Sequence, residues 1–232
     1  MTLRQSMIVA VAALSALVAG GGDIAAQAAP ASAPVAQAGP TAVEIADRIQ
    51  GFYDKTRTFK SRFKQRYVIR GYNKQIDSTG QVVFEKPGKM SWRYTNNGNR
   101  VVSDGTTMKV YEKENKQMFV QDMVKSQYPA ALSFLVGGGS LRTSFDIRKL
   151  DAGQLRFEGG YVLEAKPREA TPAYQTMLIY ADAKTNQVRR VLILDAQGNR
   201  NRFDFVSPEL NVKVPPTEFT FQPPAGTQIV RP

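Results

Sequence analysis

The sequence contains no cysteine and no histidine, and these two absences narrow the chemistry open to the protein. Without cysteine there are no disulfides, thiolate nucleophiles, cysteine-ligated zinc sites or lipid-modified N-terminal cysteines. Without histidine there is no imidazole base, no Ser-His-Asp triad and no His-ligated metal site. An enzyme would have to rely on carboxylates, lysine, tyrosine or serine. We therefore expect a protein that is not an enzyme and that uses no metal and no cofactor.

Acidic residues are also scarce, because 20 Asp and Glu stand against 31 Lys and Arg and give a formal net charge of +11. A basic excess is typical of proteins that bind nucleic acid, an anionic membrane or an acidic protein. The 232 residues are 42% hydrophobic, which is enough for a sizeable core in one domain with a short leader. Composition alone leaves the partner open.

The N-terminal segment has the features of an export signal. Arg4 precedes an uncharged apolar run over residues 7–22, and Ala26-Gln27-Ala28 places small residues before a cleavage site. The alternative is a membrane anchor, but the strongly apolar part, residues 7–19, is shorter than the roughly 20 residues that span a bilayer. Export argues against nucleic acid as a partner. We predict a cleaved signal peptide over residues 1–28, a disordered Ala/Pro-rich linker over 29–40 and a single domain over 41–232.

Two helices are predicted in the domain. The capping-box pattern Thr41-Ala-Val-Glu44 starts a helix of about 15 residues. A second helix is predicted over residues 129–136 and ends at Gly137-Gly138-Gly139. The glycine triplet lacks the Lys-Ser/Thr of a phosphate loop, so we interpret it as a hinge behind a lid helix. Apolar residues with helical spacing follow the capping box at Ile45, Ile49 and Phe52.

The rest of the domain is predicted to be mostly strand. Residues 59–70, FKSRFKQRYVIR, alternate between an aromatic face and a basic face, as in a strand buried on one side. Similar runs follow, joined by turn residues such as Asp104-Gly105. We predict an α+β, mostly β fold in which a large curved antiparallel sheet forms an incomplete barrel with helical lids. The later predicted strands cover residues 89–95, 100–103, 107–111, 117–121, 144–149, 161–166, 175–181, 188–195, 201–206 and 219–221.

Two helices cannot densely cover a sheet that carries so many large apolar side chains. Either the sheet closes on itself or it leaves an apolar cavity beneath the helices, and we favour the cavity. Each residue assigned to its lining could instead be plain core. The residues predicted to line the cavity are Phe63, Tyr67, Met90, Trp92, Leu132, Leu135, Phe145 and Phe203.

The other face of residues 59–70 carries basic side chains at five of six positions. A solvated strand face normally mixes both signs of charge. A row of one sign therefore suggests a docking surface for an acidic partner, and an ordinary solvated face is the alternative. This basic row consists of Lys60, Arg62, Lys64, Arg66 and Arg70.

Five short motifs follow one another in a specific order. They are Phe59-x-x-x-Phe63-x-Gln65; Lys86-Pro87-Gly88-Lys89-Met90-Ser91-Trp92-x-Tyr94; Val101-Val102-Ser103-Asp104-Gly105 with Tyr111; Pro129-Ala-Ala-Leu132-x-Phe134-Leu135; and Phe219-x-Phe221-x-Pro223-Pro224-x-Gly226. With these motifs, the sequence from about residue 41 to residue 230 resembles the LolA family of periplasmic carriers, which move lipoproteins from the inner to the outer membrane.

The resemblance implies a set of partners. These are acylated lipoproteins as cargo, an inner-membrane ABC transporter of the LolCDE type as the source of energy, and a LolB-like acceptor at the outer membrane. It also implies a monomeric periplasmic protein with an interior that shelters acyl chains. LolB is itself anchored through an N-terminal cysteine, so the absence of cysteine favours the carrier.

One position departs from the family pattern. Relatives carry arginine before the position of Pro87, and the resemblance implies that this arginine tethers the lid through hydrogen bonds to helix carbonyls. This chain has Lys86, which offers a point charge instead of a rigid fork of donors. We expect Lys86 to latch the lid loosely; a solvated lysine at a strand end is the alternative.

Two other functions are compatible with the sequence. One is a periplasmic regulatory protein that senses lipid or lipoprotein with the same fold, although such proteins usually carry an additional C-terminal domain. The other is an enzyme that acts on lipids or envelope sugars, for which we would expect a tight pair of carboxylates that the sequence does not suggest.

Overall fold

The computed structural model describes residues 39–123, 132, 134, 135, 137, 139–171 and 173–231. These residues belong to one unit that begins at Gly39. The predicted signal peptide, residues 29–38 of the predicted linker and most of the predicted helix over 129–136 lie outside the described residues. Within the described ranges, no helix has the length and apolar character needed to cross a membrane.

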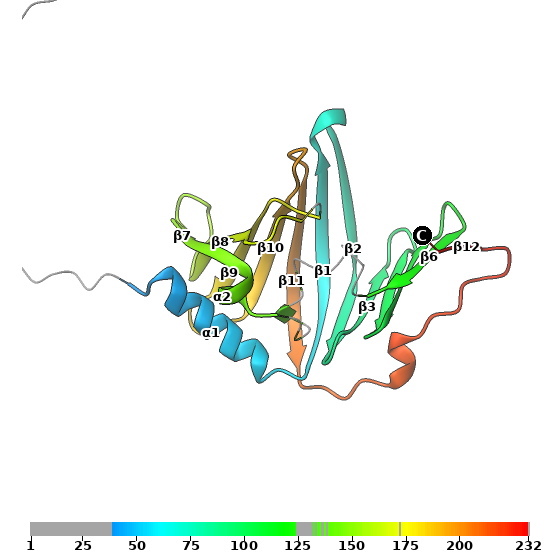
Figure 1. Cartoon of the computed structure of the whole chain (residues 1–232), viewed down its shortest axis with the longest axis horizontal. Coiled ribbons are helices and arrows are strands. Elements are labelled where there is room, and N and C mark those ends of the chain that lie inside the picture. Colours follow the sequence, from blue (N-terminus) through cyan, green and yellow to red (C-terminus); the bar gives the residue numbers. More distant parts are fainter. Residues whose placement is uncertain are drawn as a thin grey trace, which may run out of the picture. The chain divides into compact units, whose positions relative to one another are not determined.

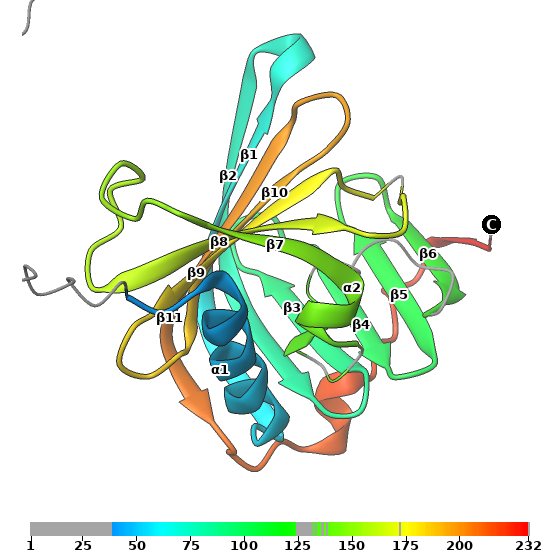
Figure 2. The ribbon, with the colours of Figure 1, turned by 60° about the vertical axis from the view of Figure 1, so that its left-hand side comes forward.

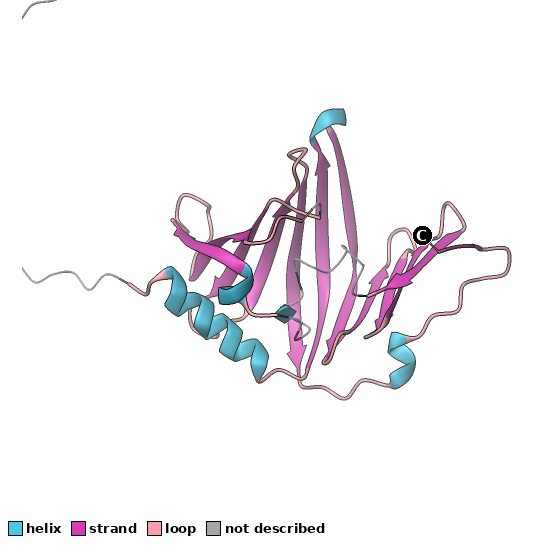
Figure 3. Ribbon diagram, viewed as in Figure 1, coloured by secondary structure: helices cyan, strands magenta, loops and turns pink. Residues whose placement is uncertain are grey.

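The described strands form one twelve-stranded sheet. They are β1 (Thr58–Ile69), β2 (Lys74–Glu85), β3 (Lys89–Tyr94), β4 (Arg100–Asp104), β5 (Thr107–Glu112), β6 (Gln117–Asp122), β7 (Phe145–Leu150), β8 (Gly160–Pro167), β9 (Thr176–Asp182), β10 (Val188–Leu194), β11 (Arg200–Leu210) and β12 (Gln228–Val230). Their order is β12-β6-β5-β4-β3-β2-β1-β11-β10-β9-β8-β7, so β12 and β7 are the two edges and the sheet is open. The sheet curves strongly (Figures 1 and 3), which confirms the predicted incomplete barrel.

Helix α1 (Ala42–Asp54) begins where the capping box predicts. The Thr41 hydroxyl accepts the Glu44 N–H at 3.2 Å, and the Glu44 carboxylate accepts the Thr41 N–H at 2.7 Å. The second bond holds the pKa of Glu44 below its ordinary value. The helix lies across the concave side of the sheet (Figure 2), with the short helix α2 (Leu141–Ser144) beside it.

Strand β2 is absent from the sequence prediction, because Asp77, Ser78 and Gly80 interrupt its apolar pattern with residues typical of turns. Its register with β1 places Gly80 opposite Phe63. A Cβ at Gly80 would lie 2.0 Å from the Arg93 carbonyl oxygen and 2.7 Å from the Phe63 ring. Glycine therefore allows the close approach of three strands that larger residues would push apart.

The C-terminal segment corrects two other predictions. Residues 219–221 are not a strand, because Pro216–Phe219 form the 3-10 helix η3 on the convex side of β3. Glu218 in this helix accepts the Ser91 hydroxyl at 2.6 Å and forms an ion pair with Arg93. The chain then reaches β12, which pairs in parallel with β6, so the sheet is not wholly antiparallel.

Candidate functional site

Most residues predicted to line a cavity lie together on the concave side of the sheet. Seven of the eight are buried in one apolar cluster, which we call the concave cluster. The eighth, Tyr67, is half-buried. The seven are Phe63, Met90, Trp92, Leu132, Leu135, Phe145 and Phe203.

Trp92 is at the centre of the aromatic part of the concave cluster. Its ring centroid lies 5.0 Å from that of Phe63, 5.6 Å from that of Phe84 and 5.1 Å from that of Phe203. The four rings come from β3, β1, β2 and β11, and strand alternation turns them all to the same side. Their edge-on and tilted contacts are arrangements that aromatic pairs favour. Three of the residues predicted to line the cavity, Phe63, Trp92 and Phe203, thus pack directly against one another.

Tyr67 instead lines a groove of about 210 Å³. Ile76 and Val110 contribute apolar surface to this groove, and Gln65 and Asn99 contribute polar groups. The groove extends the concave side along β1 and β2, beyond the aromatic rings.

Tyr53 joins α1 to the sheet and to the predicted lid. Its side chain is fully buried, and its hydroxyl oxygen accepts the Val188 N–H of β10 at 3.1 Å. Burial raises the pKa of this hydroxyl above its ordinary value. Its ring also contacts Phe134 edge-on, with the centroids 5.7 Å apart. Tyr53 is not among the residues predicted from the sequence, although it follows Ile45 by eight residues and so shares its helix face.

Lys86 contacts both α1 and the glycine segment. Its Nζ donates a hydrogen bond to the carbonyl oxygen of Tyr53 in the last turn of α1. Its methylene groups pass so close to Gly137 that a Cβ there would lie 3.1 Å from the Lys86 Cδ. Burial lowers the pKa of Lys86, and the Asp54 carboxylate partly opposes this shift. Lys86 therefore lies between the end of α1 and Gly137.

The basic row lies on the convex side of β1, except for Arg70. Arg70 begins the 3-10 helix η1 (Arg70–Tyr72), because β1 ends one residue earlier than predicted. Lys60 pairs with Glu209 at 3.4 Å, and Arg66 pairs with Asp77 at 2.9 Å. Within the described part of the chain, Arg62 and Lys64 have no ion-pair partner, and both are exposed. The row is therefore partly neutralised by acids on neighbouring strands.

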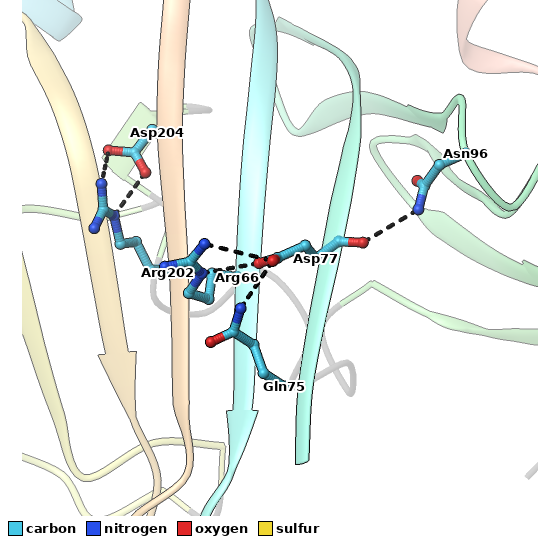
Figure 4. A network of polar contacts seen from close by, with 6 residues as sticks. All are labelled: Arg66, Gln75, Asp77, Asn96, Arg202 and Asp204. Carbon is cyan, nitrogen blue, oxygen red and sulfur yellow. Dashed lines mark hydrogen bonds and ion pairs between the residues drawn. The ribbon is translucent and has the colours of Figure 1, made fainter.

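A polar network surrounds Arg66 on this face (Figure 4). The Asp77 carboxylate also accepts a hydrogen bond from Gln75 at 2.8 Å, and the Arg66 guanidinium holds the pKa of Asp77 below its ordinary value. On β11, Asp204 binds both Arg202 and Arg190. These acids fix cations in place, so Arg62 and Lys64 offer the charge most available to a partner.

The acidic side chains do not form a metal site in the described ranges, where no three of them come together. Asp104 instead accepts the N–H groups of Thr106 and Thr107 at 2.9 Å, and thereby caps the predicted turn between β4 and β5. These bonds hold the pKa of Asp104 below its ordinary value. Asp104 thus has a structural role in the chain.

Comparisons with known proteins agree with the motif pattern. Residues 54–222 match the family model described as "Outer membrane lipoprotein carrier protein LolA". An outer-membrane lipoprotein carrier protein of Methylibium petroleiphilum is 28% identical over 195 residues, which are 83% of this chain and 92% of that protein. One of Dechloromonas aromatica is 26% identical over 185 residues, 79% of this chain and 86% of its own. A solved LolA superfamily protein of Nitrosomonas europaea gives a TM-score of 0.45 at 14% identity, covering 78% of this chain and 98% of that one.

Proposed function

We propose a specific carrier function from the premise that this chain belongs to the LolA family of outer-membrane lipoprotein carrier proteins. Proteins of this family are carriers, not enzymes. We propose that the protein shelters the acyl chains of lipoproteins released from the inner membrane and delivers them to the outer membrane. The observation that carries this proposal is the concave cluster on an open sheet, to which α1, Leu132 and Leu135 contribute side chains.

The free energy of moving acyl chains explains why such a cluster is needed. Burial of one methylene is worth about 0.8 kcal/mol, so a sixteen-carbon chain represents about 12 kcal/mol that must be replaced when it leaves a bilayer. Cargo would enter by displacing the cover and taking its place against Trp92 and its neighbours. One set of apolar contacts is then exchanged for another, so cargo can be held and still released.

The proposed partners follow from the same reasoning. The sequence has no nucleotide-binding motif, so the energy for extraction must come from a membrane partner, which we propose to be an ABC transporter of the LolCDE type. A LolB-like acceptor would receive the cargo at the outer membrane. We propose that the protein is monomeric and works in the periplasm after cleavage of residues 1–28, and that Arg62 and Lys64 of the basic row meet the transporter.

Depletion of the protein in its own cells tests the proposed function. Membrane fractionation should then recover acylated lipoproteins in the inner membrane, because they no longer have an apolar site in which to cross the periplasm. Re-expression should restore their place in the outer membrane. Normal sorting after depletion would contradict a carrier function, and normal sorting with an altered stress response would favour the sensory alternative.

The latch role of Lys86 is tested by the substitution Lys86→Leu. Leucine keeps the packing beside Gly137 but removes the donor to the Tyr53 carbonyl oxygen. Because cargo is proposed to displace the cover, this bond stabilises the covered form without cargo. A hydrogen bond from a charged donor is worth about 1.5 kcal/mol at the low end, so its loss favours the loaded form and release of bound lipoprotein should be about tenfold slower. The rate is measured by transfer of labelled lipoprotein to acceptor vesicles.

Lys86→Arg is the matched control, because it restores a donor and adds the second arm of a fork. Its release rate should equal or exceed that of the native protein. Loading and release that are unchanged by Lys86→Leu would instead identify Lys86 as an ordinary lysine at a strand end.

A further inference from the structure

The hairpin that joins β1 to β2 projects beyond the neighbouring strands (Figures 1 and 2). Helix η1 turns the chain, and Asn73 adopts a left-handed backbone with φ of 46° before β2 begins. The turn between β10 and β11 lies beside it, because the Asn199 side chain accepts the Arg70 N–H at 2.9 Å. Together these turns form one tip, which we call the hairpin tip and define by Arg70, Tyr72, Lys74 and Arg200.

Tyr72 is the most exposed large apolar side chain of the described residues, with 84% of its surface accessible. It lies at the end of the projecting hairpin, where no strand or helix of the described fold covers it. Tyrosine combines an apolar ring with a polar hydroxyl, and it is enriched where proteins meet the headgroup region of a membrane. The exposed side chain of Tyr72 is therefore chemically suited to a lipid interface.

Cations surround Tyr72 at the hairpin tip. Arg70, Lys74 and Arg200 are all exposed, and none has an ion-pair partner among the residues that the structure describes. The nearest acid of the adjoining turn, Asp195, is occupied, since its carboxylate accepts the N–H groups of Gln197 and Asn199. The tip therefore combines an exposed aromatic ring with an excess of positive charge.

We propose that the hairpin tip binds the surface of a membrane that contains anionic phospholipids, with Tyr72 at headgroup level and the three cations on lipid phosphates. A stable protein–protein contact buries about 800 Å² on each partner, more than two adjoining turns can offer, whereas a lipid surface adapts to a small convex tip. The groove beside Tyr67 and Ile76 begins on the same hairpin. Membrane contact at the tip would bring this groove toward the lipid.

Vesicle binding by the purified protein without cargo tests the proposal. Sedimentation should recover the protein with equimolar phosphatidylglycerol–phosphatidylcholine vesicles and not with phosphatidylcholine vesicles. Each cation near an anionic surface strengthens binding about fivefold, so Arg70→Ser with Lys74→Ser should weaken it about 25-fold. Lys184→Ser with Lys213→Ser removes the same charge from exposed positions elsewhere and should leave binding unchanged.

A second measurement places Tyr72 in the lipid interface. The variant Tyr72→Trp should show a blue-shifted, bromolipid-quenched emission with anionic vesicles, above the constant signal of the buried Trp92. The proposal is overturned if anionic vesicles do not bind the protein, or if both charge-removal pairs weaken binding equally. It is also overturned if the tip variants bind anionic vesicles as well as the native protein does and lose only binding to a membrane protein. Vesicle binding requires no cargo. The membrane-binding proposal can therefore be correct even if depletion leaves lipoprotein sorting normal and the carrier function is wrong.

Discussion

Replacing Leu132 by aspartate is expected to abolish lipoprotein carriage while the protein stays folded. Leu132 is only 5% exposed and packs in the concave cluster, so a carboxylate there would lose its solvation without gaining a partner. Such burial costs several kcal/mol. If Leu132 belongs to a lid, the lid can leave the sheet and expose the carboxylate. The substitution then weakens closure of the lid over the acyl chains and leaves the stability of the sheet unchanged.

The measurement combines capture of a labelled lipoprotein by the purified variant with its unfolding by urea. Leu132→Met keeps volume and apolar character, so it should retain carriage at a cost below about 1.5 kcal/mol. Trp92→Ala gives the contrast, because removal of this buried ring from β3 should lower the free energy of unfolding by about 3–5 kcal/mol. A loss of that size in Leu132→Asp would assign Leu132 to the structural core and contradict a lid.

Local signals in the sequence predicted much of the fold. The bonds between Thr41 and Glu44 form as the capping box requires, and β1 carries the predicted aromatic and basic faces. Strand β2 escaped prediction because its pairing with β1 and β3 outweighs the turn tendency of Asp77 and Gly80. Strand β12 is only three residues long and is defined by its distant partner β6, which no local pattern can indicate.

The sequence predicts which face of the sheet each candidate site residue occupies, but not how deeply its side chain is buried. Alternation assigns Phe63 and Tyr67 to the same face, yet packing buries Phe63 among other rings and leaves Tyr67 beside a groove. The charge of the basic row was overestimated for a similar reason. Asp77 comes from the unpredicted strand β2, and Glu209 lies 149 residues from Lys60. Partners distant in sequence decide how much of each charge is available.

Reversal of the two cations of the basic row that are unpaired on the convex side of β1, Arg62→Glu with Lys64→Glu, is expected to weaken binding to an acidic membrane transporter by about a hundredfold. Both side chains are exposed on the convex side, away from the concave cluster. Two reversals change the charge of this face by four, and like charges brought together across an interface cost several kcal/mol. About 2.8 kcal/mol of this cost suffices for a hundredfold change.

Binding is measured between the purified protein and the transporter in nanodiscs, at two ionic strengths, because screening should reduce the difference between variant and native protein. Lys184→Glu with Lys213→Glu is the control, since it changes the net charge equally at exposed positions outside the row. Equal weakening by both pairs would show that only the overall charge of the protein matters. Unchanged transporter binding would make the row an ordinary solvated face. Retained capture of lipoprotein, together with lost transporter binding, would separate the docking surface from the acyl-chain site.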